Sequence, residues 1–149
     1  FYLQQWYSTT DNSITSYMFY KCKALTNICL PNNATTIGKS AFSDCNALTG
    51  INIPNNIATI GIEAFASTTS LTTVTIGNSV TSIGKWAFLS CSKLTNFYFY
   101  GTKEPSYGVG VFRYCDSLKT IYVPTTYTDD DETKFCGYSF TIKKELTPM

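Results

Sequence analysis

Residues 71–93 read LTTVTIGNSVTSIGKWAFLSCSK, and another LT follows at once from Leu94. Two closely similar stretches precede it: LTNICLPNNATTIGKSAFSDCNA at 25–47 and LTGINIPNNIATIGIEAFASTTS at 48–70. The repeats start at Leu25, Leu48, Leu71, Leu94 and Leu118, in steps of 23, 23, 23 and 24 residues. A fixed period of this length is typical of a solenoid, in which each coil buries its apolar side against its neighbours.

The opening residues of each repeat alternate between apolar and polar. Leu71, Val74 and Ile76 are expected to point inward, whereas Thr73 and Thr75 point outward, which is the pattern of a short half-buried β-strand. This core and the period of 23 predict a leucine-rich repeat solenoid. We expect short parallel β-strands on its concave face, and turns with short helical or 3-10 segments on its convex face.

Two further pairs of residues recur in phase. An Ile-Gly pair, such as Ile60-Gly61, follows the strand, and we expect its glycine to serve a turn with positive φ. An Ala-Phe pair comes next, and stacked phenylalanines are expected to form a spine on the convex side. The spine residues are Phe19, Phe42, Phe65, Phe88 and Phe112.

The repeats predict one leucine-rich repeat domain over residues 1–149. Residues 1–24 are expected to form a degenerate N-terminal repeat or cap, because only their later positions keep the register. Four full repeats follow at 25–47, 48–70, 71–93 and 94–117. Residues 118–149 begin as a repeat and then abandon the pattern, which predicts a last strand and a C-terminal cap.

The composition argues against several functional classes. Histidine is absent, which removes the commonest general base at neutral pH and the commonest metal ligand. The net charge of +1 gives no electrostatic footprint for nucleic acid, and no apolar stretch is long enough to span a bilayer. No phosphate-binding glycine motif is present either. We therefore expect a non-catalytic protein without a cofactor or metal, without nucleic acid as a partner and without membrane insertion within this chain.

Four of the six cysteines occupy one column of the predicted stack: Cys22, Cys45, Cys91 and Cys115. The second repeat has Thr68 in that column. Disulfides between neighbouring coils are one interpretation, since stacked Cα atoms fall within the span of a disulfide. The threonine favours the other interpretation, a small buried side chain at this position.

The outward side chains of the repeated strands form a surface that we call the strand face. Such faces are habitual binding surfaces of solenoids. The candidate protein-binding residues on it are Asn27, Asn52, Thr73, Thr75, Asn96, Tyr98, Tyr100, Thr120 and Tyr122. Small polar residues also keep a sheet solvated, which is the alternative for the first three repeats. For the tyrosines the alternatives are anchors for a partner or closure of the C-terminal end of the core.

Two short motifs have simple structural interpretations. Asp129, Asp130, Asp131 and Glu132 lack the spacing of an EF-hand loop and are expected to form a solvated acidic turn. Asn33-Ala34-Thr35 matches the glycosylation sequon, which matters only in a glycosylating secretory pathway.

The repeat LTTVTIGNSVTSIGKWAFLSCSKL resembles that of the BspA-like leucine-rich repeat proteins, close to L-T-x-I-x-I-P-x-x-V-T-x-I-G-x-x-A-F-x-x-C. The resemblance implies a cell-surface or secreted protein of a microbe or protozoan parasite. Its function would be adhesion to host matrix, host cells or other microbes, with protein or glycoprotein ligands as partners. The alternative is a structural spacer or scaffold that displays another domain.

Overall fold

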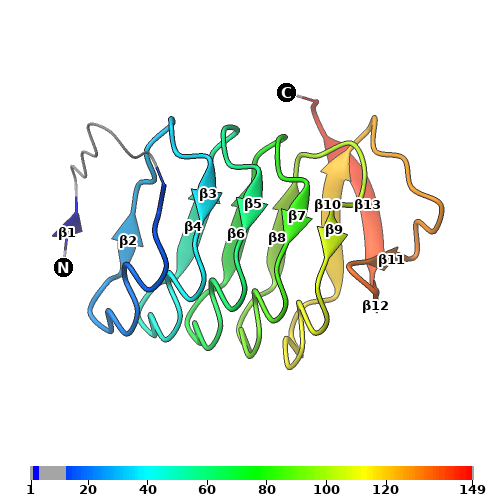
Figure 1. The fold of residues 1–149 in the computed structure, drawn as a ribbon. Helices are drawn as coiled ribbons and strands as arrows, with labels where there is room; N and C mark the ends of the chain where they lie inside the picture. The colour runs from blue at the N-terminus through cyan, green and yellow to red at the C-terminus, as the bar shows by residue number, and fades with distance from the viewer. Residues whose placement is uncertain (1, 4–12, 149) are drawn as a thin grey trace.

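Each repeat forms one coil of a solenoid in the computed structural model, which describes residues 2–3 and 13–148 (Figure 1). The main sheet is parallel and contains one strand from each of four coils and one from the C-terminal segment. In spatial order these strands are β4 (Gly50–Ile53), β6 (Thr73–Ile76), β8 (Asn96–Phe99), β10 (Thr120–Pro124) and β13 (Thr141–Leu146). The predicted solenoid with parallel strands is thus confirmed.

The register of the main sheet places equivalent repeat positions side by side. Thr73 lies opposite Gly50 on one side and Asn96 on the other, and Thr75 lies between Asn52 and Tyr98. Inward positions are buried and outward positions are half-buried or exposed along every strand. The strand face therefore has the two columns of side chains that the repeat predicts.

A second parallel sheet lies across the coil from the first. Its two-residue strands are β3 (Thr36–Ile37), β5 (Thr59–Ile60), β7 (Ser82–Ile83) and β9 (Ser106–Tyr107). The sequence predicts the inward isoleucines of these strands but not the pairing. The strands form because a Thr-Ile or Ser-Ile pair recurs in phase in β3, β5 and β7, so each coil presents the same extended backbone to the next.

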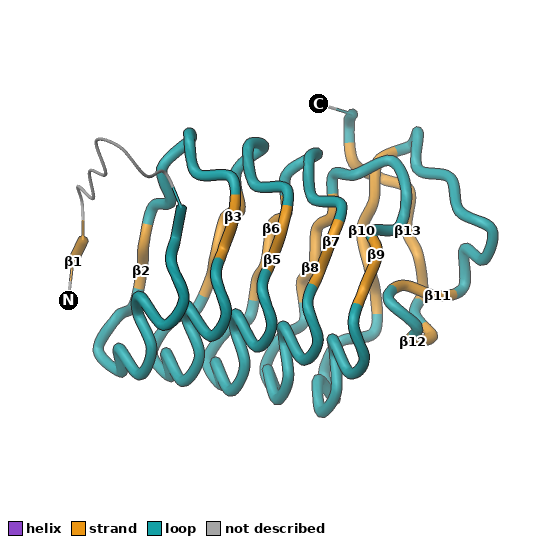
Figure 2. Tube along the Cα trace, viewed as in Figure 1, coloured by secondary structure: helices purple, strands orange, loops and turns teal. Residues whose placement is uncertain are grey.

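The turn side of the coils contains no helix within the described residues, so the expected helical or 3-10 segments are wrong (Figure 2). Backbone N–H groups alternate in direction there. Phe42 and Asp44 donate to Ala64 and Ala66 of the next coil, whereas Ser43 donates to Ser40 of its own coil. A helix would use every N–H within the coil. It follows that no helix able to cross a bilayer exists in the described part of the chain.

Positive φ angles recur on these turns at residues other than glycine. Ser40 has φ 52° and Asp44 has φ 59°, and the equivalent positions of other coils, such as Glu63 and Trp86, have similar values. Each turn has two left-handed residues four positions apart. They reverse the local twist of the backbone and prevent a continuous right-handed helix. The cost of these conformations is offset by the hydrogen bonds that each coil makes with the next.

The repeated glycines have a different role from the predicted one. Among described glycines, positive φ occurs at Gly110 and Gly137 and not at the Ile-Gly positions, so that expectation is wrong. A Cβ on Gly61 would lie only 2.7 Å from the carbonyl carbon of Gly38 and 2.8 Å from the carbonyl oxygen of Ile37. Glycine is required because neighbouring coils approach backbone to backbone.

The core of the solenoid has the predicted phenylalanine spine. The spine runs through Phe19, Phe42, Phe65 and Phe88, and the ring centroids of each neighbouring pair lie 5.1–5.3 Å apart. The centroid of Phe112 lies 5.7 Å from that of Phe88. All five rings are buried. Offset stacking of aromatic rings adds to the stabilisation that burial of their surface provides.

Three thiols of the cysteine column, those of Cys45, Cys91 and Cys115, are buried and that of Cys22 is half-buried; all six cysteines of the chain are free. The Cys45 thiol donates to the carbonyl oxygen of Phe19 at 3.1 Å, and Cys91 and Cys115 make the equivalent contact with the preceding coil. The Thr68 hydroxyl makes the same hydrogen bond to Phe42, at 3.2 Å. The column thus selects a small buried side chain with a donor, which explains why threonine substitutes for cysteine.

The two ends of the solenoid differ. At the N-terminal end Ile14 bridges to Ile37 and Phe19 joins the spine, while β1 (Tyr2–Leu3) pairs with β2 (Asn27–Ile28). Residues 1 and 4–12 of the predicted N-terminal cap lie outside the described residues. At the C-terminal end the antiparallel pair β11 (Lys134–Phe135) and β12 (Tyr138–Ser139) places Phe135 against the core, 5.1 Å from the ring of Phe99.

We predict that Gly61→Ala lowers the free energy of unfolding by about 1–3 kcal/mol, because the added methyl group must push two backbones apart. Gly50→Ala is the matched control, since a Cβ there would meet its nearest neighbour, the Thr73 carbonyl oxygen, at 3.6 Å. Urea denaturation of both variants measures the difference. Equal stability of the two variants would contradict the close approach at Gly61.

We also predict that Thr68→Cys is nearly neutral, whereas Thr68→Val costs about 1 kcal/mol because valine has the shape of threonine but no donor for the Phe42 carbonyl. The same denaturation experiment compares the two variants. A valine variant as stable as the cysteine variant would show that shape alone, and not the hydrogen bond, determines this column.

Candidate functional site

The strand face brings the predicted binding residues onto one surface. Asn27 lies on β2, Asn52 on β4, Thr73 and Thr75 on β6, Asn96 and Tyr98 on β8, and Thr120 and Tyr122 on β10. Tyr100 directly follows β8, where its N–H donates to the Ile76 carbonyl oxygen at 2.9 Å. The structure therefore places eight of the nine residues on the main sheet or directly after one of its strands, with Asn27 on β2 beside it, and it separates them into two regions of different chemistry.

The first region is the tyrosine end of the strand face. The rings of Tyr98 and Tyr122 stack with centroids 5.1 Å apart and an interplanar angle of 30°. Both side chains are half-buried outward residues of the main sheet. They do not close the core, because Phe135 and Tyr127 fill that end and are fully buried. The tyrosine pair is thus held in place while its outer surface stays accessible.

A lysine that sequence reasoning missed completes this region. The Lys143 ammonium nitrogen lies 5.8 Å from the centroid of the Tyr122 ring, within the range of a cation–π contact. Lys143 is on β13, directly opposite Tyr122 in the register. In TIKKEL at 141–146 only Ile142 and Leu146 are apolar, so the segment lacks the alternation of the repeats, and nothing in the repeat pattern aligns it with Tyr122.

Tyr107 does not join the tyrosine end. It lies on β9 in the second sheet, and its side chain is 47% exposed. Arg113 and Tyr114 contact each other on the turn side, with the guanidinium carbon 5.0 Å from the ring centroid. These exposed residues are therefore separate from the strand face.

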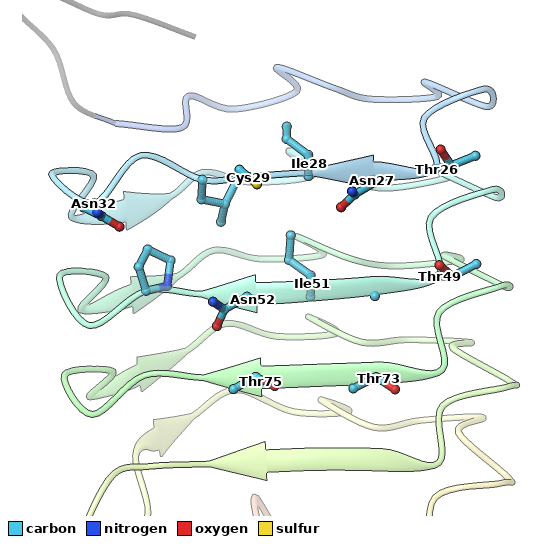
Figure 3. A pocket seen from close by; sticks show the side chains of 13 residues that line it. Thr26, Asn27, Ile28, Cys29, Asn32, Thr49, Ile51, Asn52, Thr73 and Thr75 are labelled. Carbon is cyan, nitrogen blue, oxygen red and sulfur yellow. The ribbon is translucent and has the colours of Figure 1, made fainter. Parts of the chain in front are cut away.

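The second region is a groove at the other end of the strand face, which extends over β2, β4 and β6 (Figure 3). Its volume is about 770 Å³, and its lining includes four predicted residues: Asn27, Asn52, Thr73 and Thr75. β2 pairs with β1 and not with β4, so the ladder of the main sheet is interrupted there. Sequence reasoning did not predict the groove, although the outward Gly50 was a signal that one side chain is missing from the face.

The groove reaches slightly into the core. Ile28 and Ile51 are 8% and 5% exposed, whereas the equivalent Val74 and Phe97 are fully buried. A smaller hollow of about 410 Å³ lies at the end of β4, and Asn32, Asn52 and Pro54 line both hollows. Amide side chains therefore continue from the groove to the edge of the coil.

The acidic run has a structural role in the C-terminal cap. The Tyr127 hydroxyl donates to Asp129 at 2.9 Å, and Lys144 pairs with Glu132 at 2.6 Å. Hydrogen bonds from the side chain and backbone of Thr133 lower the pKa of Asp131. Within the described residues, no group of three or more acidic or cysteine side chains is placed to hold a metal ion.

The Glu104 carboxylate connects the irregular loop of the fourth repeat to this cap by accepting the Cys136 N–H at 2.5 Å. Burial raises the pKa of Glu104, partly offset by that hydrogen bond. This contact explains the loop of the 24-residue fourth repeat as a support for the cap.

Comparison with known proteins agrees with this architecture. The family model described as BspA type Leucine rich repeat region matches residues 12–142 in 6 copies. The leucine-rich repeat protein TpLRR of T. pallidum is 29% identical and superposes with a TM-score of 0.67, over 76% of this chain and 52% of that chain. A leucine-rich repeat protein of Bacteroides ovatus ATCC 8483 is 17% identical, with a TM-score of 0.34, over 78% of this chain and 54% of that one.

The comparison with curated proteins gives no match. The chain spans about half the length of the two solved chains that it resembles.

We predict that native-state alkylation at pH 8 modifies Cys29 well before Cys45, Cys91 and Cys136. Cys29 is exposed in the groove, whereas burial raises the pKa of the Cys45 thiol to about 12 and keeps it protonated. Mass spectrometry of timed samples gives the order of modification. Six reactive thiols are expected after denaturation without reductant, and a smaller number would contradict the free-thiol assignment.

Proposed function

The chain belongs to the BspA-type leucine-rich repeat family, and from this membership we propose that it is a non-catalytic protein-binding module of an adhesion protein. The strand face is the proposed binding surface, and the partners are proteins or glycoproteins on host matrix, host cells or neighbouring microbes. A cell-surface or secreted location accompanies this proposal, because an adhesin must meet its partner outside the cell.

The stacked Tyr98–Tyr122 pair is the observation that carries the proposal. Tyrosine is enriched among the anchor residues of protein interfaces, because it combines a large apolar ring with a polar hydroxyl. Each ring restrains the other at 5.1 Å, so binding a partner costs little side-chain entropy. Lys143 adds a positive charge beside Tyr122, which favours a partner with an acidic or carbonyl-rich contact surface.

The remaining residues of the strand face suit a partner that approaches closely. Asn96 and Thr120 are small, half-buried and polar, and they flank the tyrosine pair on the same strands. Short side chains leave the anchors projecting above their surroundings, and they supply hydrogen bonds at the rim. A solenoid that presents such a face over successive coils is suited to multivalent contact.

A structural spacer is the second candidate function. The first coils favour this function. The outward residues of β4 and β6 are small, and none of them is a large aromatic residue that could anchor a partner. The continuous pairing from β4 to β10 would also suit a rod that displays another domain.

We predict that Tyr98→Ala/Tyr122→Ala weakens attachment to immobilised matrix proteins or cultured host cells by more than about tenfold, because both anchors are lost. The matched control is Tyr17→Ala/Tyr20→Ala, which removes an exposed edge-to-face pair with centroids 5.6 Å apart on the turn side. Surface plasmon resonance with the intact chain measures the matrix interaction.

Circular dichroism and urea denaturation establish that both double variants are folded. Unchanged attachment of the folded Tyr98/Tyr122 variant would rule out the tyrosine end as the binding site. If the wild-type chain attaches to none of these surfaces, the spacer function is favoured instead.

A further inference from the structure

The groove between β2 and β4 has walls made of uncharged polar side chains. Asn27, Asn32 and Asn52 supply amides, and Thr73 and Thr75 supply hydroxyls. None of the thirteen lining residues is Asp, Glu, Lys or Arg. Each amide offers both donors and acceptors, and each hydroxyl donates and accepts as well. The walls therefore match a ligand that is itself rich in groups that donate and accept, and that carries no charge.

The base of the groove is apolar. It is lined by Ile28, Leu30 and Ile51, whose surfaces are 5–9% exposed. Most of the inward residues of later coils are fully buried. A ligand with hydroxyl groups at its edge and C–H groups on its face would satisfy walls and base together. Burial of those C–H groups contributes the non-directional part of the affinity.

The groove exists because of one feature in each of two adjacent coils, 25–47 and 48–70. β2 has only two residues and pairs with β1, so it does not complete the ladder with β4. Gly50 provides no side chain at the outward position where the later coils have Thr73 and Asn96. The resulting volume of about 770 Å³ lies within the range of about 300–1,000 Å³ that is typical of small-molecule sites.

We propose that this groove binds a neutral saccharide. A saccharide ring has polar edges and apolar faces, which the amide walls and the isoleucine base complement. An anionic saccharide would have to bury charge against uncharged walls, which costs free energy without a compensating partner. The site is distinct from the tyrosine end, so it does not rest on the function proposed above.

An extended peptide fits the groove less well. Peptides that dock on sheets commonly pair with a free strand edge or insert aromatic and charged anchors. β2 and β4 leave the edges that face each other unpaired, but no aromatic or charged residue lines the groove. Peptide binding would thus lack the side-chain anchors on which it usually depends, and the peptide titration below tests whether backbone pairing alone is enough.

Cys29 supplies a reporter for occupancy, because it is exposed and lines the groove. Wild-type protein is titrated with mannopentaose, cellopentaose and lacto-N-tetraose, and separately with a heparin hexasaccharide and an unstructured Gly-Ser peptide, each up to about 5 mM. Isothermal calorimetry measures binding, and the rate of Cys29 alkylation measures protection. At least one neutral saccharide is expected to bind and to slow alkylation of Cys29.

Gly50→Tyr is the blocking variant, because its side chain would start from a position with room for a Cβ and fill the groove. Asn96→Tyr is the matched control, since residue 96 occupies the same column two strands away, outside the groove lining. We expect about tenfold or greater loss of saccharide affinity for Gly50→Tyr, with little change for Asn96→Tyr. Asn52→Ala should lose several-fold through a missing hydrogen-bonding side chain.

Three results would overturn the proposal: no neutral saccharide binds the wild-type protein, only the heparin hexasaccharide or the peptide protects Cys29, or Gly50→Tyr and Asn96→Tyr lose affinity equally. The Tyr98→Ala/Tyr122→Ala variant should keep its saccharide affinity. Loss of protein attachment in that variant with saccharide binding intact separates the two sites, so either function can fail without the other.

Discussion

Hydrogen bonding from one coil to the next is the constraint on which the rest of this structure depends. Alternate N–H groups of the turn side leave their own coil, as when Phe42 donates to Ala64. Those bonds require the backbones to run side by side in the same conformation over the whole turn. The left-handed residues at Ser40 and Asp44, the absence of a helix in the described residues and the close approach at Gly61 all follow from that requirement. The donor column at Cys45 and Thr68 extends it from the backbone to the side chains.

The sequence predicted those parts of the fold that can be recognised within a single repeat. Alternation within LTTVTI identifies the inward and outward residues of β6 without reference to any other coil. A phenylalanine that recurs at steps of 23 residues must stack on its equivalents, whatever the path of the chain between them. The turn side was predicted wrongly because its conformation depends on the direction of individual N–H groups. Serine and aspartate at positive φ give no compositional signal, and glycine suggests positive φ even where it serves close packing.

The candidate site was predictable to the same extent. The columns of the strand face came directly from the repeat, and so did the outward position of Tyr98 and Tyr122. Lys143 was missed because the C-terminal strand abandons the repeat, so its register with Tyr122 is decided by packing of the cap. The groove was missed for a related reason. The groove arises because β2 does not pair with β4. The repeat pattern predicts that neighbouring strands pair, so it gives no sign of a pairing that is absent.

A solenoid allows the two ends of one face to differ because each coil contacts only its neighbours. Glycine at residue 50, where the next strand has Thr73, changes the surface locally and leaves the inward Ile51 and Ile53 in the same columns as Val74 and Ile76. Tyrosines at 98 and 122 likewise change the far end without altering the register of β6 with β8. Outward residues are thus released from the constraint that fixes the inward ones. Binding chemistry on this fold therefore follows the irregular outward positions, and both proposed sites lie where those positions depart furthest from the repeat.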